Sequence, residues 1–186
     1  MNNKLTIYKD NKIVEASYRL TLNEQRLVLA CIGQVNSFEA LAATNRFDVS
    51  VSDFSTLFGI TEKRAYRELK SVINTLYERS ITIMDERSVT GKATFRWISA
   101  KYHDLVKQTI GLRFSPDILP YLSKLESAFT KYQIQYVSGM KSVYSMRIYE
   151  MLVQWRTTKS VAITIASMRH QLQLDGKYPA FADIEA

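Results

Sequence analysis

Residues 54–78 read FSTLFGITEKRAYRELKSVINTLYE and predict two helices joined by a tight turn. The first helix presents apolar residues at the i, i+3 and i+4 positions of one face: Phe54, Leu57 and Phe58. Gly59 follows them, and glycine easily takes the left-handed conformation that ends many helices. Thr61 then supplies a capping hydroxyl for a second helix that reaches about residue 78.

The second helix is amphipathic. We expect its buried stripe to contain Tyr66, Leu69, Ile73 and Leu76. Basic side chains lie off this stripe: Lys63, Arg64, Arg67 and Lys70. Two interpretations remain open. The basic side chains could face DNA phosphates or base edges, or they could form an ordinary solvated face, because Glu62, Glu68 and Glu78 share the helix.

The segments around this helix pair complete a recognisable order. Thr21 and Glu24 form a capping-box pattern before an apolar helical stripe, and residues 47–51 alternate like a strand. After the pair, we predict strands at 80–86, 93–102 and 109–114, with the first two joined as a hairpin. This order predicts an α+β fold, a winged helix made of a helix-turn-helix and a β-hairpin wing. We expect Arg87 and Lys92 to lie on that wing.

The pattern then recurs 114 positions later. Alternating apolar residues predict a strand at 161–165, and two further positions, Met168 and Leu172, mark a short helix. Shifted back by 114 positions, they match Phe47, Val49, Val51, Phe54 and Phe58. We therefore expect a first winged-helix domain over residues 1–138, with DNA backbone contact. Residues 139–186 would be the N-terminal part of a second, incomplete winged helix.

A long helix is predicted between the two copies. Its apolar positions are Tyr144, Ile148, Met151, Leu152 and Trp155. We expect this stripe, Trp155 included, to be buried in the core.

The charge balance favours a polyanionic partner. The 186 residues include 25 Lys and Arg against 18 Asp and Glu, a formal net charge of +7. Residues 141–177 are especially basic, with six cations and only Glu150 and Asp175 as acids. We therefore expect the second copy to be the stronger DNA-binding half.

Enzymatic chemistry has no recognisable site in the sequence. The single cysteine, Cys31, excludes an intrachain disulfide framework, and its place on an apolar helix face indicates a buried, inert thiol. The two histidines, His103 and His170, are far apart and form no metal-ligand pair. We therefore expect no enzyme activity, metal or cofactor. Apolar runs also fall short of a membrane span, and we expect a cytoplasmic protein without membrane contact.

Short motifs in a consistent order give the sequence a family resemblance. They are Lys9-Asp10-Asn11, LNEQRLVL at 22–29, FRWI at 95–98, LPYL at 119–122, FTKY at 129–132, YSMRIYEML at 144–152 and GKY at 176–178. With these motifs the chain resembles the iteron-binding Rep initiators of bacterial plasmids. The resemblance implies tandem winged helices that bind repeated double-stranded DNA at a plasmid origin and have no catalytic site. It also implies homodimers held mainly through the first winged helix, residues 1–138, and host replication partners such as a helicase.

The resemblance extends to individual residues of the second module. It implies DNA contacts by Lys141, Arg147, Lys177 and Tyr178. Compared with the family, the sequence ends at Ala186 before a full recognition helix and wing, so we expect a fragment or a naturally shortened form. Two alternatives stay open: a winged-helix transcriptional regulator without a role in replication, and a protein-interaction module that touches no DNA.

Overall fold

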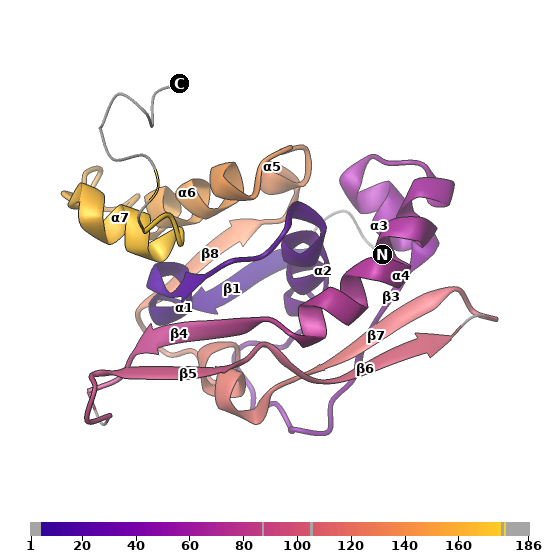
Figure 1. Ribbon diagram of the computed structural model, residues 1–186, viewed down its shortest axis with the longest axis horizontal. Coiled ribbons are helices and arrows are strands. Elements are labelled where there is room, and N and C mark those ends of the chain that lie inside the picture. The colour runs from indigo at the N-terminus through magenta and orange to yellow at the C-terminus, as the bar shows by residue number, and fades with distance from the viewer. Residues whose placement is uncertain (1–4, 87, 105, 176, 178–186) are drawn as a thin grey trace.

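The computed structural model describes residues 5–86, 88–104, 106–175 and 177, and it is a mixed helix and strand structure (Figure 1). The helices are α1 (Asn11–Glu15), α2 (Leu22–Ile32), α3 (Val51–Phe58), α4 (Glu62–Tyr77), α5 (Gln135–Ser138), α6 (Val143–Gln154) and α7 (Ile165–Gln171), with a 3₁₀ helix η1 (Pro116–Tyr121). The strands are β1 (Thr6–Asp10), β2 (Ser17–Tyr18), β3 (Phe47–Ser50), β4 (Ser80–Met84), β5 (Lys92–Arg96), β6 (Ile98–Asp104), β7 (Thr109–Phe114) and β8 (Phe129–Gln133).

These strands form three small antiparallel sheets. Their orders are β1-β8, β2-β4-β5 and β3-β7-β6. In the third sheet, β3 precedes the α3–α4 helix pair and pairs with β7, which closes the unit after the pair. The helix pair and this sheet form the winged helix that the sequence predicts.

The hairpin of the winged-helix sheet is β6–β7. We predicted the wing one hairpin earlier, at the turn that carries Arg87 and Lys92, and this assignment is wrong because β4–β5 pairs with β2 instead. The two hairpins extend to opposite ends of the molecule in Figure 1, with β6–β7 on the side of α3 and α4. Lys92 is exposed at the start of β5, whereas Arg87 lies outside the described residues.

A single buried residue separates the two sheets along the chain. The segment predicted as one strand over 93–102 divides at Trp97 into β5 and β6. The Trp97 ring is buried and lies edge-on to Tyr18, with 4.9 Å between ring centroids. Its backbone N–H donates to the carbonyl of Arg79, and its carbonyl accepts from Ser115. The apolar alternation changes phase at this corner, from Ala93, Phe95 and Trp97 to Ile98, Ala100 and Tyr102. The prediction of one continuous strand overlooked this change.

Helix α2 runs through the middle of the core. Its residues from Glu24 to Ile32 are all buried, and it begins with the predicted capping box, in which Thr21 and Glu24 satisfy each other's backbone N–H groups. The Cys31 thiol is buried, as expected, and burial raises its pKa. The thiol is therefore inert in the folded protein.

Helix α6 forms where predicted but buries a different face. Trp155, directly after the helix, is 40% exposed, and Leu152 is 61% exposed, so the expected apolar stripe faces outward. The buried residues are instead Met146, Arg147 and Glu150. Burial of the two charged side chains is possible because each meets partners on distant parts of the chain.

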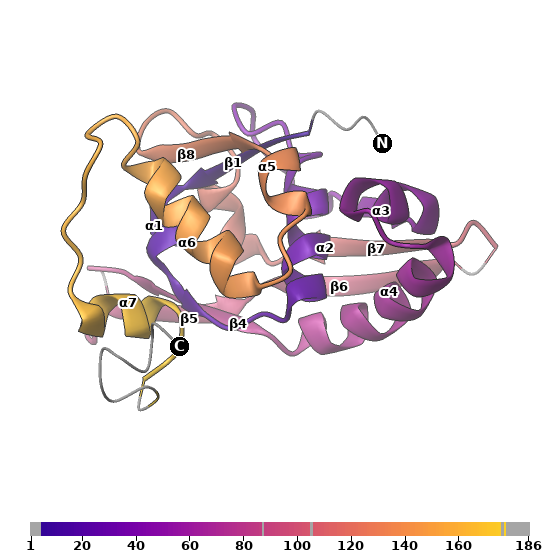
Figure 2. The same cartoon turned by 90° about the horizontal axis from the view of Figure 1, so that it is seen from above.

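Glu150 and Arg147 fasten α6 to the N-terminal strands. The Glu150 carboxylate accepts hydrogen bonds from Lys9 Nζ on β1, at 2.5 Å, and from the Tyr132 hydroxyl on β8. Lys9 and Glu150 are both almost fully buried. Burial and the neighbouring Glu150 carboxylate raise the pKa of Tyr132. Figure 2 shows α6 lying across β1 and β8.

Strand β8 was not predicted. It pairs antiparallel with β1, with Ile7 opposite Tyr132, and it buries Thr130 and Tyr132. The two strands are more than 100 residues apart in sequence, so no local turn sequence indicates that they pair.

One part of the predicted second copy, its short helix, is present as α7. Thr164 caps α7 by accepting from the N–H of Ser167, just as Ser50, 114 positions earlier, caps α3. The predicted strand at 161–165 is wrong, because Ile165 begins α7 and Val161 and Ile163 are exposed without a paired strand among the described residues. The first copy pairs β3 with β7, and positions 114 residues beyond β7 fall outside the 186-residue sequence.

Replacing Lys9 by Met should destabilise the protein by about 3–5 kcal/mol, because it leaves the Glu150 carboxylate buried without its cation. Urea unfolding of the variant measures this cost. The control is Arg46→Met, which breaks the half-exposed Arg46–Asp48 pair and should cost at most about 1 kcal/mol. Equal costs for the two substitutions would contradict the anchoring role of Lys9.

Candidate nucleic-acid interface

The turn between α3 and α4 has the geometry expected from its sequence. Gly59 lies in the left-handed region, with φ 62° and ψ 38°, and its N–H donates to the carbonyl of Ser55. The Thr61 hydroxyl then accepts from the N–H of Arg64 at 3.4 Å and caps α4. These contacts fix the angle at which α4 leaves the turn.

Helix α4 packs one face and exposes the other. Its buried residues are Ala65, Leu69, Val72, Ile73 and Leu76. Tyr66, which we predicted on this stripe, is 41% exposed. It shares a small surface hollow with Lys70 and His103, beside strand β6. The exposed side of α4 carries all four predicted cations: Lys63, Arg64, Arg67 and Lys70.

Acidic residues on α4 neutralise only part of this face. Glu68 accepts from Asn23 at 2.7 Å and pairs with Arg64 at 3.6 Å, so its charge is directed toward α2 and Arg64. Glu78 pairs with Arg96 on β5. Lys63, Arg67 and Lys70 form no ion pair with any residue that the structure describes. Three exposed cations without an ion-pair partner among the described residues are therefore left in a row along α4, with the exposed Glu62 as the one acid beside them at the start of the helix.

The sheet extends this row with a lysine that the sequence analysis missed. Lys101 on β6 donates to the Asn74 side chain on α4 at 2.7 Å, and its Nζ lies 5.1 Å from the centroid of the Tyr77 ring. The signal was present in the alternation of residues 98–104, where Lys101 falls on an exposed position. It could not be used because these residues were assigned to the wrong hairpin.

The cations expected in the second module are distributed differently. Lys141 and Lys177 are exposed, and Tyr178 lies outside the described residues. Arg147 is buried: its guanidinium donates to the backbone carbonyls of Val14, Ala16, Tyr18 and Gln171 and lies over the Tyr18 ring. The expectation that Arg147 contacts DNA is therefore corrected, because its side chain holds the core together.

Two other findings concern metal binding and membrane crossing. Within the described ranges, His, Cys, Asp and Glu side chains do not gather in groups of three or more that could hold a metal ion. Among the same residues, no helix has both the length and the apolar character needed to cross a bilayer.

The helix pair, its three-stranded sheet and the basic exposed face of α4 define a winged-helix protein. The chain belongs to the family described as Initiator Replication protein, WH1, which matches residues 6–153. The family resemblance noted from the short motifs is thus confirmed.

The chain is also similar to individual proteins of Escherichia coli. The chain is 29% identical over 185 residues to a replication initiation protein of Escherichia coli, covering 96% of this chain and 57% of that protein. It is also 20% identical over 167 residues to an uncharacterized 27.6 kDa protein of Escherichia coli, covering 85% of this chain and 70% of that one. The chain thus spans little more than half the length of the first relative.

The fold matches a solved structure over its whole length. The crystal structure of Pi initiator protein in complex with iteron DNA superposes with a TM-score of 0.83 at 20% sequence identity. The match covers 100% of this chain and 82% of that chain. At this identity the comparison establishes a shared fold.

Replacing Gly59 by Ala should destabilise the protein by about 1–2 kcal/mol, the cost of holding a residue with a Cβ in the left-handed region. No atom lies within 4 Å of the added Cβ, so this cost is conformational. Gly139 is the control, because it has φ −80° and equally open surroundings, and Gly139→Ala should be neutral or slightly stabilising. Thermal unfolding checks both, and similar shifts in Tm would argue against a strained turn.

Proposed function

We propose that the chain binds double-stranded DNA as part of a plasmid replication initiator and recognises repeated sequences at an origin. The observation that carries the proposal is the exposed row of Lys63, Arg67 and Lys70 on the second helix of a helix-turn-helix. Membership of the initiator family and the iteron DNA in the Pi complex support the same function.

The proposed contacts are with the phosphate backbone. The flexible amines of Lys63 and Lys70, and the guanidinium of Arg67, can each replace a counterion condensed on DNA. Arg64 can join them, although it shares Glu68. Lys92, Lys141 and Lys177 are exposed and remain candidates on other surfaces. We expect such contacts to position the protein on the duplex, since phosphates carry no direct sequence information.

The wider proposal follows the family. We propose two modules, 1–138 and 139–186, with the second module also binding DNA. We further propose that the protein acts in the cytoplasm by binding rather than by catalysis. Its partners would be a second copy of the chain and host replication proteins such as a helicase.

The substitutions Arg67→Glu and Lys70→Glu together should weaken binding to a duplex with direct repeats. The slope of log affinity against log salt should become less negative by about 2, one for each lost phosphate contact. Fluorescence anisotropy at several salt concentrations measures both affinity and slope.

A charge-matched control uses Lys124→Glu with Lys131→Glu. Both lysines are exposed and lie just before and within β8, away from α4. This control has the same net charge as the α4 variant and should keep most of the affinity. Equal losses in the two variants, or no DNA binding by the parent chain, would refute an interface on α4.

A further inference from the structure

A cleft of about 460 Å³ lies where the start of α2, the end of α4 and the first turn of α6 meet. Three arginines line it: Arg19, Arg79 and Arg147. Among the described residues, its lining contains no Asp or Glu. This concentration of positive charge is separate from the exposed face of α4.

Arg147 brings a buried charge to the cleft. Carbonyl oxygens occupy its two terminal nitrogens, but its Nε is buried without a hydrogen-bond partner among the residues described. No carboxylate among the described residues forms an ion pair with Arg147. The Nε is covered and cannot reach a ligand in the cleft, but the charge of a buried guanidinium without a counter-ion favours an anion nearby.

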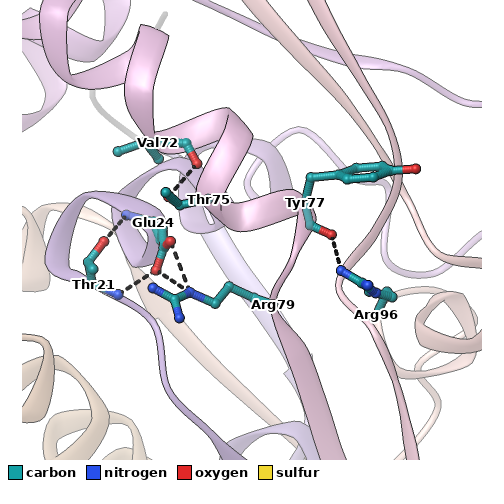
Figure 3. Close-up of polar contacts among 7 residues, drawn as sticks. All are labelled: Thr21, Glu24, Val72, Thr75, Tyr77, Arg79 and Arg96. Atoms are coloured by element: carbon teal, nitrogen blue, oxygen red, sulfur yellow. Dashed lines mark hydrogen bonds and ion pairs between the residues drawn. The ribbon is translucent and has the colours of Figure 1, made fainter.

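A neighbouring carboxylate fixes the position of the Arg79 side chain. Its Nε contacts both oxygens of the buried Glu24, at 3.0 and 3.1 Å, as Figure 3 shows. Glu24 is itself fixed, because it accepts from the N–H of Thr21 at the start of α2. Within the described chain, the terminal nitrogens of Arg79 have no protein acceptor. Since Glu24 balances one cation, the charges of Arg19 and Arg147 are left uncompensated.

The start of α6 adds backbone donors to the same cleft. Val143 and Tyr144, the first two residues of this 12-residue helix, belong to the lining. The Ser142 side chain makes no capping hydrogen bond, and the first turn contains no acidic residue. The N–H groups of a helix start and the positive end of its dipole both favour a bound anion.

We propose that this cleft binds a phosphate group through Arg19, Arg79 and the free N–H groups at the start of α6, with the buried charge of Arg147 behind them. A phosphate offers several charged oxygens in a tetrahedral arrangement, which suits several guanidinium and N–H donors around one cleft. The site goes beyond the proposed contacts on α4. Its phosphate could belong to a small phosphorylated compound or to a DNA backbone, and the chemistry of recognition is the same.

Bound phosphate would also contact the edge of the second module. Leu172, just after α7, lines the cleft, and the carbonyl of Gln171 already accepts from Arg147. The anion would therefore sit between the first module and α7.

The test is a titration of the ¹⁵N-labelled chain with inorganic phosphate at constant ionic strength, followed by NMR. The N–H signals of Val143 and Tyr144 should shift and saturate. Arg19→Gln should weaken the phosphate affinity by about tenfold or more, the usual effect of losing a charged hydrogen bond. Arg19 is exposed, so this variant should fold, whereas Arg147 variants would disturb the core.

Arg156→Gln is the matched control, because Arg156 is exposed and does not line the cleft. It should titrate like the parent chain. Shifts that do not saturate, or equal affinities in Arg19→Gln and the parent, would overturn the proposal.

A second arm identifies the source of the phosphate. Duplex DNA added to the phosphate-saturated protein should either displace the phosphate, which places a DNA backbone in the cleft, or bind alongside it, which indicates a small phosphorylated ligand. Both results support a phosphate site. The Arg67→Glu and Lys70→Glu variant should titrate normally with inorganic phosphate, so failure of the α4 interface and failure of the cleft are distinguishable.

Discussion

Two buried charges on α6 hold the N-terminal part of the chain together. Glu150 joins β1 and β8 through Lys9 and Tyr132, and Arg147 gathers the carbonyls of α1 and β2. Burying these two charges need not add net stability, since removing them from water is costly. Their effect is on the position of α6: if the helix slipped along the strands, both charges would stay buried but lose their hydrogen-bond partners. The charges therefore fix where the helix sits.

The sequence was most informative where its signals were local. The caps at Thr21 and Thr61 and the left-handed Gly59 lie within a few residues of the contacts they make, and all were found where expected. The candidate face on α4 was predictable for the same reason. Its cations follow from helical periodicity alone.

Other features depended on partners that the local pattern does not reveal. The helix at α6 was predicted, but its buried face was not, because Arg147 was expected to contact DNA and Glu150 lies off the apolar stripe. Their partners lie more than 100 residues away or on the missed strand β8. Lys101 was overlooked because apolar alternation gives the strand but not the strand's neighbour. The sequence thus predicted the elements of the winged helix better than their pairing.

The corner at Trp97 has a consequence for how related sequences can vary in length. One residue separates β5 from β6, and its ring and backbone are both held in the core. Adding or deleting one residue there would turn every side chain of one strand to the opposite face of its sheet. The loops at 40–46 and 88–91 carry no such restriction, because they connect elements over the surface. Length differences among homologues should therefore gather in those loops, while the spacing across Trp97 stays constant.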